Sequence, residues 1–70
     1  MLREPVSSSN IESIGYDLDS SILEISFLNS GIYQYYNVPE IIYDGIMSAG
    51  SKGSYFHQNV KGKYQYKKIK

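Results

Sequence analysis

Apolar and polar residues alternate along the segment Ser21–Leu28. Leu23, Ile25 and Phe27 share one face of this segment, and Glu24 lies on the other. A period of two residues is typical of a β-strand with one buried face, because successive side chains point to opposite sides of a sheet. We predict a strand here.

Similar alternation occurs on both sides of this strand. Ile11–Asp17 precedes it, across the turn-prone residues 17–20, and Ile32–Asn37 follows it after the loop of residues 29–31. Short polar loops that contain asparagine or glycine connect antiparallel neighbours. The three segments therefore predict a three-stranded antiparallel β-meander.

After Pro39 the apolar residues change to a helical spacing. Ile42, Ile46 and Ala49 fall on one face of a helix that starts at Pro39, where the missing N–H has no partner to lose. Gly50 offers a left-handed end to this helix. The pattern predicts an amphipathic helix that lies across one face of the sheet.

A second, shorter helix is predicted from Ser51 to Gly62, in which Phe56 and Val60 form an apolar pair four residues apart. The next segment, Lys63–Ile69, alternates tyrosine with polar residues. It forms either a short fourth strand or an extended arm.

The elements combine into a single small domain. Residues 1–9 have no apolar face and are expected to be a flexible lead-in, which leaves residues 10–70 as one domain. The predicted fold class is α+β: a three-stranded antiparallel β-meander followed by an α-helix and a short second helix. Whether a short C-terminal strand follows is not decided by the sequence.

The stretch Gly31–Pro39 joins the meander to the first helix and holds three tyrosines in four residues. On a strand, Tyr33 and Tyr35 share one face, and Tyr36 and Val38 share the other. If the helix covers the Tyr36 face, the other two tyrosines are open and can stack bases. If it covers their own face, they are core residues whose hydroxyls reach water.

Opposite charges occupy the two parts of the chain, although the net charge is zero. One arginine and seven acids leave residues 1–50 at −6, and six lysines without an acid leave residues 51–70 at +6. A concentrated basic segment indicates a polyanion or an acidic partner. The alternatives are attraction between the two ends and a solvated lysine tail.

Residue types that carry catalysis are scarce. The chain has no cysteine and one histidine, His57, which cannot hold a metal unaided. No glycine-rich loop has the strand-to-helix spacing of a phosphate loop. Asp17 and Asp19 lie in a predicted turn, where carboxylates usually form turn hydrogen bonds. We expect a protein that is not an enzyme and uses neither a metal nor a cofactor.

The sequence also indicates a compartment. No segment approaches the roughly 18 consecutive apolar residues that span a membrane, and residues 1–6 lack the apolar region of a signal peptide. The absence of cysteine fits a reducing environment. We expect a cytoplasmic protein with no membrane partner.

Several short motifs resemble a known family. In order, they are Val6–Ile11, Ile14–Asp17, the Tyr-x-Tyr of Tyr33 and Tyr35, Val38-Pro39, Tyr43, Ala49 ahead of Ser51-Lys52-Gly53, and Tyr55-Phe56. In this combination the chain resembles the KTSC domain, which occurs alone in bacterial proteins and at the C-terminus of some lysyl-tRNA synthetases. The resemblance covers nearly the whole chain. Attachment to a synthetase implies RNA binding.

The leading hypothesis is a non-catalytic nucleic-acid-binding module, with RNA favoured over DNA. Lysines would contact phosphates, bases would stack on Tyr33, Tyr35 or the aromatic residues after residue 54, and the start of the second helix would seat a phosphate. The candidate residues are Tyr33, Tyr35, Ser51, Lys52, Gly53, Tyr55, His57, Lys61, Lys63, Tyr64, Lys67 and Lys68.

Salt dependence tests this hypothesis against its rival. If most of the C-terminal lysines contact phosphates of a single strand, log affinity should fall against log salt with a slope of roughly −3 to −4. The rival hypothesis is a protein-protein interaction module that uses the acidic half or an exposed sheet edge. Its binding would survive high salt.

Overall fold

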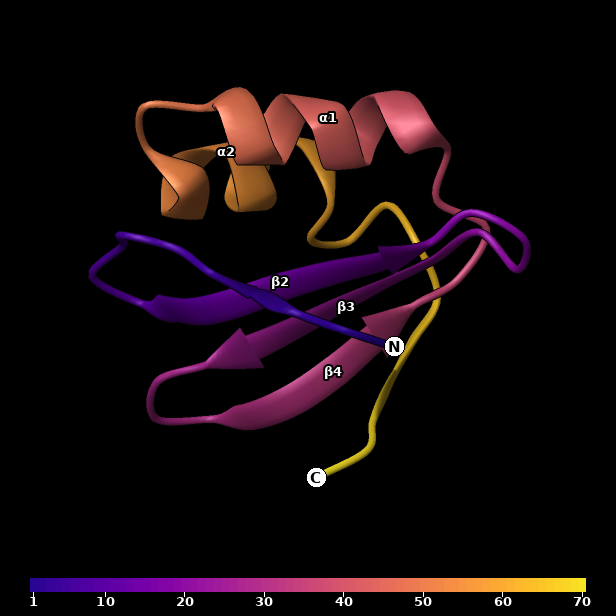
Figure 1. Ribbon diagram of the computed structural model, residues 1–70, viewed down its shortest axis with the longest axis horizontal. Coiled ribbons are helices and arrows are strands. Elements are labelled where there is room, and N and C mark those ends of the chain that lie inside the picture. Colours follow the sequence, from indigo (N-terminus) through magenta and orange to yellow (C-terminus); the bar gives the residue numbers. More distant parts are fainter.

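Five strands form one antiparallel sheet in sequence order, and two helices lie on one of its faces (Figure 1). The structure is a computed structural model that describes residues 1–70. Both helices come between the fourth and fifth strands. The elements are β1 Glu4–Pro5, β2 Ile11–Asp17, β3 Ile22–Phe27, β4 Gly31–Tyr35, α1 Glu40–Ser48, α2 Lys52–Asn59 and β5 Tyr66–Lys68.

The α+β class is confirmed, and the predicted meander forms the middle of the sheet. β2 pairs with β3, and β3 pairs with β4, all antiparallel. Gly31 has a φ of +94°, which suits a glycine in the β3–β4 connection. Asp17 accepts hydrogen bonds from the Asp19 backbone at 3.3 Å and the Ser20 hydroxyl at 2.6 Å, so it forms the predicted turn. β5 confirms the alternative of a short C-terminal strand, whereas β1 adds an edge strand that was not predicted.

β1 lies inside the segment expected to be a flexible lead-in, where no strand was predicted. It pairs with β2 through Glu4 opposite Ile14 and Pro5 opposite Ser13. The chain before β1 passes over Gly15, where an added Cβ would lie 2.6 Å from the Leu2 carbonyl oxygen. Glycine therefore permits the close approach that holds this segment against the sheet.

The first helix does not end as predicted. Gly50 adopts no left-handed conformation, and the C-cap is Ala49 in an extended conformation. The Lys52 ammonium instead donates hydrogen bonds to the carbonyls of Met47 at 3.2 Å and Ala49 at 2.9 Å. These bonds satisfy two of the carbonyls that are left without an intrahelical partner at the C-terminal end of α1.

The two helices touch at Gly45. A Cβ added there would lie 2.0 Å from the Tyr55 hydroxyl oxygen. The glycine that interrupts the apolar stripe of α1 is therefore needed for the approach of a side chain from α2.

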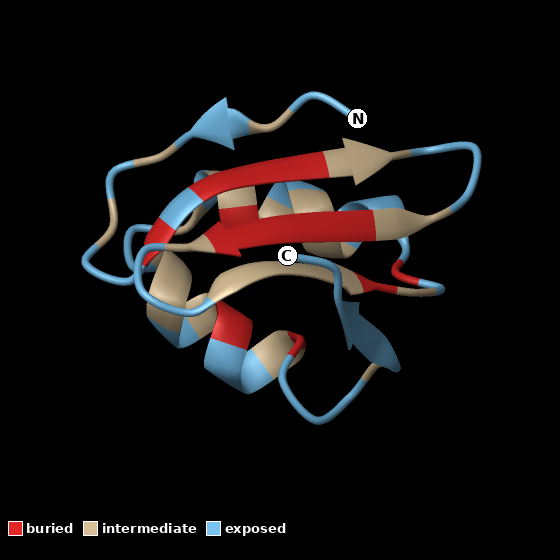
Figure 2. Cartoon of the chain, turned by 90° about the horizontal axis from the view of Figure 1, so that it is seen from below, coloured by how far each residue is buried: buried red, intermediate tan, exposed pale blue.

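The core lies between the helices and the sheet. Ile14, Leu23 and Ile25 from the sheet are fully buried together with Ile46 of α1 and Val60 after α2. Figure 2, which views the sheet from the side opposite the helices, shows the buried stretches along the middle of β2 and β3. Phe56 is also buried, so the predicted pairing of Phe56 with Val60 as an apolar face is confirmed.

The helices cover the face that carries Tyr33 and Tyr35. These residues oppose Ile25 and Leu23 across the β3–β4 ladder, and opposed residues share a face. The alternative in which the helix covers a Tyr36 and Val38 face is wrong. β4 ends at Tyr35, and Asn37 turns the chain with a φ of +58°, so Val38 leaves the alternation and enters the core.

Candidate functional site

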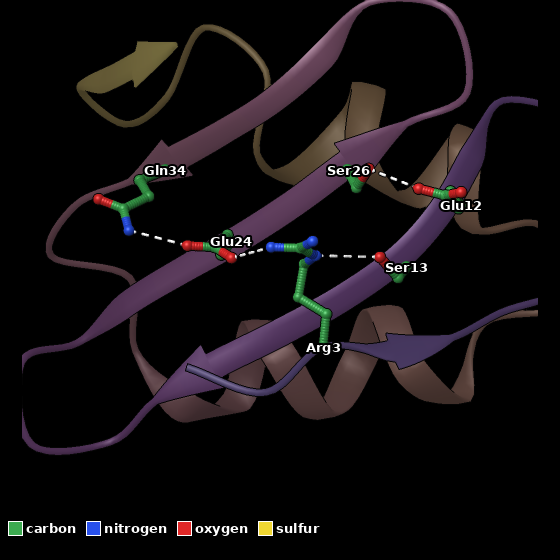
Figure 3. A network of polar contacts seen from close by, with 6 residues as sticks. All are labelled: Arg3, Glu12, Ser13, Glu24, Ser26 and Gln34. Carbon is green, nitrogen blue, oxygen red and sulfur yellow. Dashed lines mark hydrogen bonds and ion pairs between the residues drawn. The ribbon is translucent and has the colours of Figure 1, made fainter. Parts of the chain in front are cut away.

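The open face of the sheet carries a hydrogen-bonded polar network (Figure 3). Arg3 pairs with Glu24 and donates from Nε to the Ser13 hydroxyl at 3.1 Å. Gln34 Nε2 donates to Glu24 Oε1 at 2.8 Å, and Ser26 donates to a Glu12 carboxylate oxygen at 2.8 Å. Each strand from β2 to β4 contributes to this surface.

Glu24 is only 5% exposed, and its charge is compensated by this network. Burial acts to raise its pKa, but the hydrogen bonds from Gln34 and Arg3 and the charge of Arg3 outweigh burial and lower the pKa. The open face is therefore a structural surface. The Tyr36 hydroxyl also belongs to the polar network, because it donates a hydrogen bond to Gln34 Oε1 at 3.3 Å.

A cleft of about 400 Å³ opens on the other face, between α2 and the β3–β4 hairpin. We call it the aromatic cleft, since five rings and one imidazole line it. Its residues are Phe27, Tyr33, Tyr35, Phe56, Tyr66 and His57, with Asn10, Ile11, Asn29, Ser30, Gly53, Lys61 and Gly62.

The rings form a connected wall. Tyr35 is 5% exposed, and its ring centroid lies 5.5 Å from that of Phe56 and 5.6 Å from that of Tyr66. Burial, and to a lesser extent the neighbouring Tyr33 and Tyr66, raise the pKa of Tyr35 to about 12. Tyr35 is thus a neutral core residue. This agrees with the alternative in which the helix covers the sheet face of Tyr33 and Tyr35.

The other two tyrosines of the aromatic cleft are more accessible. Tyr33 is half-buried, with its ring edge-on to Phe27 at 5.6 Å. Tyr66 is 61% exposed and opposes Tyr35 across the β4–β5 ladder. Flat ring surface is therefore offered to a ligand mainly by Tyr66, with Tyr33 beside it at 5.9 Å between centroids.

Basic residues lie in and beside the cleft, and no aspartate or glutamate lines it. Lys61 and His57 belong to its lining. Lys68 opposes Tyr33 and so lies on the cleft face of β5, whereas Lys67 opposes Gln34 and lies on the open face.

The remaining predicted residues divide into structural and exposed groups. Ser51 caps α2 by accepting from the Ser54 backbone at 3.4 Å, and Lys52 is held by α1 as described. Tyr55 packs over Gly45, and Tyr64 packs half-buried against the core. Lys63 is exposed in the turn after α2.

The structure thus brings together five of the predicted residues in one cleft: Tyr33, Tyr35, Gly53, His57 and Lys61. Eight of the 13 lining residues were absent from the list of candidate residues, among them Phe27, Asn10 and Tyr66, although Tyr66 belongs to the aromatic residues after residue 54 that were expected to stack. The alternation of Tyr64 and Tyr66 was the available signal for the last of these, but the register of β5 decides which ring enters the cleft.

Two further features of the structure bear on function. No group of three or more histidine, aspartate or glutamate side chains is arranged to hold a metal ion. Neither helix has the length and apolar character needed to cross a membrane.

The fold and the cleft define a class of protein: a small α+β domain whose helices cover one sheet face and leave an aromatic cleft at their edge. Residues 7–64 match the KTSC domain. The chain belongs to the KTSC domain family.

Similar proteins extend this assignment. A KTSC domain protein from Yersinia pestis, solved by crystallography, is 52% identical with a TM-score of 0.97, over 99% of this chain and 97% of that one. An uncharacterized protein from Stutzerimonas stutzeri is 36% identical over 99% of both chains. A lysine-tRNA ligase from Trichormus variabilis is 33% identical over 87% of this chain, which matches 11% of the ligase.

Proposed function

We propose that this domain is a non-catalytic module that binds single-stranded nucleic acid, preferentially RNA, by placing one base in the aromatic cleft. The observation that carries the proposal is a cleft of about 400 Å³ with aromatic walls, basic residues around it and no acid in its lining. Pockets for small organic groups commonly measure about 300 to 1,000 Å³.

The chemistry of the cleft suits an unpaired base. Tyr66 presents an exposed ring, and a base stacked on an aromatic side chain gains roughly 1 to 3 kcal/mol. Lys61 and Lys68 stand on the same face, where they would contact the phosphates on either side of the bound base. Stacking and charge together are the means by which single strands are bound.

The comparisons favour RNA as the polymer. Similar segments form part of lysine-tRNA ligases from Trichormus variabilis and two Nostoc species, which are enzymes that act on an RNA. Because the match covers 11% of each ligase, the ligase reaction itself is not transferred to this chain.

Substitution of Tyr66 tests the proposal. Tyr66→Leu should weaken binding of a short single-stranded RNA about tenfold, measured by fluorescence anisotropy, because the stacking surface is lost. The matched control is Tyr36→Leu on the open face, where affinity should change less than twofold. Equal affinities for wild type and Tyr66→Leu would contradict the proposal.

An NMR titration locates the surface. Shifts caused by RNA should cluster at Tyr33, His57, Lys61 and Tyr66. We count three phosphate contacts: Lys61 in the lining, Lys63 next to the lining residue Gly62, and Lys68 on the cleft face of β5. The slope of log affinity against log salt should then be about −2 rather than −3 to −4. Lys52 is held by α1, Lys67 lies on the open face, and the terminal Lys70 is not counted. Absence of shifts with mixed RNA at low salt would reject RNA binding and favour a protein partner.

A further inference from the structure

A second cavity of about 520 Å³ lies beside the aromatic cleft and has a purely polar lining. It is formed by two segments far apart in the chain, Ser7–Asn10 before β2 and Gly50–Ser54 at the start of α2, together with His57. We call it the serine groove. These segments carry two of the motifs by which the chain resembles its family, and the fold brings them together.

The serine groove and the aromatic cleft share a wall. Asn10, Gly53 and His57 line both cavities. No side chain stands at Gly53, and even an added Cβ would be 3.7 Å from its nearest neighbour, Asn10 Nδ2. The aromatic cleft and the serine groove are therefore adjacent, and no side chain separates them at Gly53.

The groups that the groove offers are mainly uncharged. The Lys52 ammonium is turned to the carbonyls of α1, and the Ser51 hydroxyl accepts from the Ser54 backbone. Ser8 is used internally as well, by the backbone amides of Asn10 and Ile11 at 3.3 Å.

On the segment before β2, three exposed side chains remain available. Ser7, Ser9 and Asn10 make no side-chain hydrogen bond within the protein, and neither does the exposed His57 across the groove. A hydroxyl both donates and accepts, and an amide does the same through its two ends. Such groups match the hydroxyls of a sugar, which also donate and accept, better than they match an anion.

We propose that the serine groove binds the ribose of the nucleotide whose base occupies the aromatic cleft, and that it selects RNA over DNA through the 2′-hydroxyl. This inference rests on the proposed function, since it needs a base in the cleft. The sugar is bonded directly to the base, so a base that lies against the shared wall of Asn10, Gly53 and His57 places its sugar at the serine groove. The 2′-hydroxyl is the group by which a site distinguishes RNA from DNA.

The test uses three oligomers of one sequence: hexauridylate, its 2′-deoxy analogue and its 2′-fluoro analogue. The 2′-fluoro oligomer lacks the hydroxyl donor and serves to separate hydroxyl recognition from sugar conformation. Wild type should bind the RNA about tenfold more tightly than either analogue, as expected for a lost hydrogen bond at a formed site. Affinity is measured by anisotropy at fixed salt.

The variant Ser7→Ala/Ser9→Ala should lower this preference to less than twofold by weakening RNA binding alone. Neither serine bonds within the protein, so folding should be unchanged by circular dichroism. The matched control is Ser48→Ala, an exposed serine on α1 that lines neither cavity and should keep the wild-type preference.

The outcomes separate this inference from the function on which it rests. Equal binding of RNA and its 2′-deoxy analogue by wild type overturns ribose recognition while leaving single-strand binding intact. A preference that survives the double serine variant, or 2′-fluoro binding as tight as RNA, also overturns it. Failure to bind any of the three oligomers rejects both proposals.

Discussion

The two faces of the sheet come from the same three central strands and have opposite chemistry. On the helix-covered face, Leu23 and Ile25 are fully buried and Tyr35 nearly so. On the open face, Glu24 and Gln34 belong to a polar network that extends to Arg3. Sheet proteins that bind RNA often present exposed rings on an open face. In this domain the rings lie under the helices, so only the edge of the covered face, beside α2, is open to a ligand.

Loss of core volume should show the largest difference between the two faces. Ile25→Ala should lower the free energy of unfolding by about 3 kcal/mol, because it leaves a cavity among fully buried residues. Ile32→Ala is the matched change on the open face, where the residue is half-buried, and should cost about 1 kcal/mol. Urea unfolding measures both. Similar losses would mean that the open face is packed as tightly as the core.

Removal of Arg3 should have the next largest effect. Arg3→Ala leaves the nearly buried Glu24 carboxylate without its cation and should cost about 2 kcal/mol. Arg3→Lys should recover part of this loss, since the charge returns but the bond to Ser13 does not. A change below about 0.5 kcal/mol for Arg3→Ala would show that the segment before β1 contributes little to stability.

Low pH should reduce the free energy of unfolding, because it protonates Glu24 on the open face. Its pKa in the folded protein is lowered below the ordinary value of 4.5, so the folded state is favoured by the ionised carboxylate above that value. This contribution is lost as the pH falls through the lowered folded-state pKa. The gap in unfolding free energy between wild type and Glu24→Gln should therefore narrow from pH 7 to pH 3.

The control for this pH series is Glu40→Gln, which removes an exposed carboxylate outside the network. Its gap from wild type should change much less over the same range. A constant gap for Glu24→Gln would contradict a lowered pKa for Glu24.

The smallest effect contrasts two neighbouring lysines on β5. Lys68 lies on the cleft face and Lys67 on the open face. Lys68→Gln should reduce the salt slope for RNA by about 0.7 and weaken binding about fivefold at 0.1 M salt, since one phosphate contact is lost. Lys67→Gln should leave both nearly unchanged. Equal effects would place RNA across the edge of the sheet rather than in the cleft.

The central elements could be predicted because their signals are local. β2 has the predicted bounds, and alternation assigned Leu23 and Ile25 to one face. β1 could not be predicted in this way, because two residues have no period. β1 forms because Gly15 leaves room for the preceding residues to approach the sheet and because Arg3 pairs with Glu24.

The candidate site was predicted less completely than the fold. Tyr33 was named from strand alternation, and His57 and Lys61 were named from the basic segment after residue 50. The three residues meet in the cleft. Lys52 was predicted to contact phosphate, but its ammonium donates hydrogen bonds to carbonyls at the C-terminal end of α1. Tyr66 was only one of several aromatic residues after residue 54 that could stack on a base, because only its register with Tyr35 places it in the cleft.

The sequence by itself determined the class of fold, the order of the central elements and the separation of charge, since these follow from periodicity and composition. Which sheet face the helices cover was decided only by the tertiary structure. At Asn37 a positive φ interrupts the alternation and sends Val38 into the core beside Tyr35. Because the segment Gly31–Val38 places tyrosines on both faces, alternation within this segment cannot choose between them, and packing against α1 and α2 makes that choice.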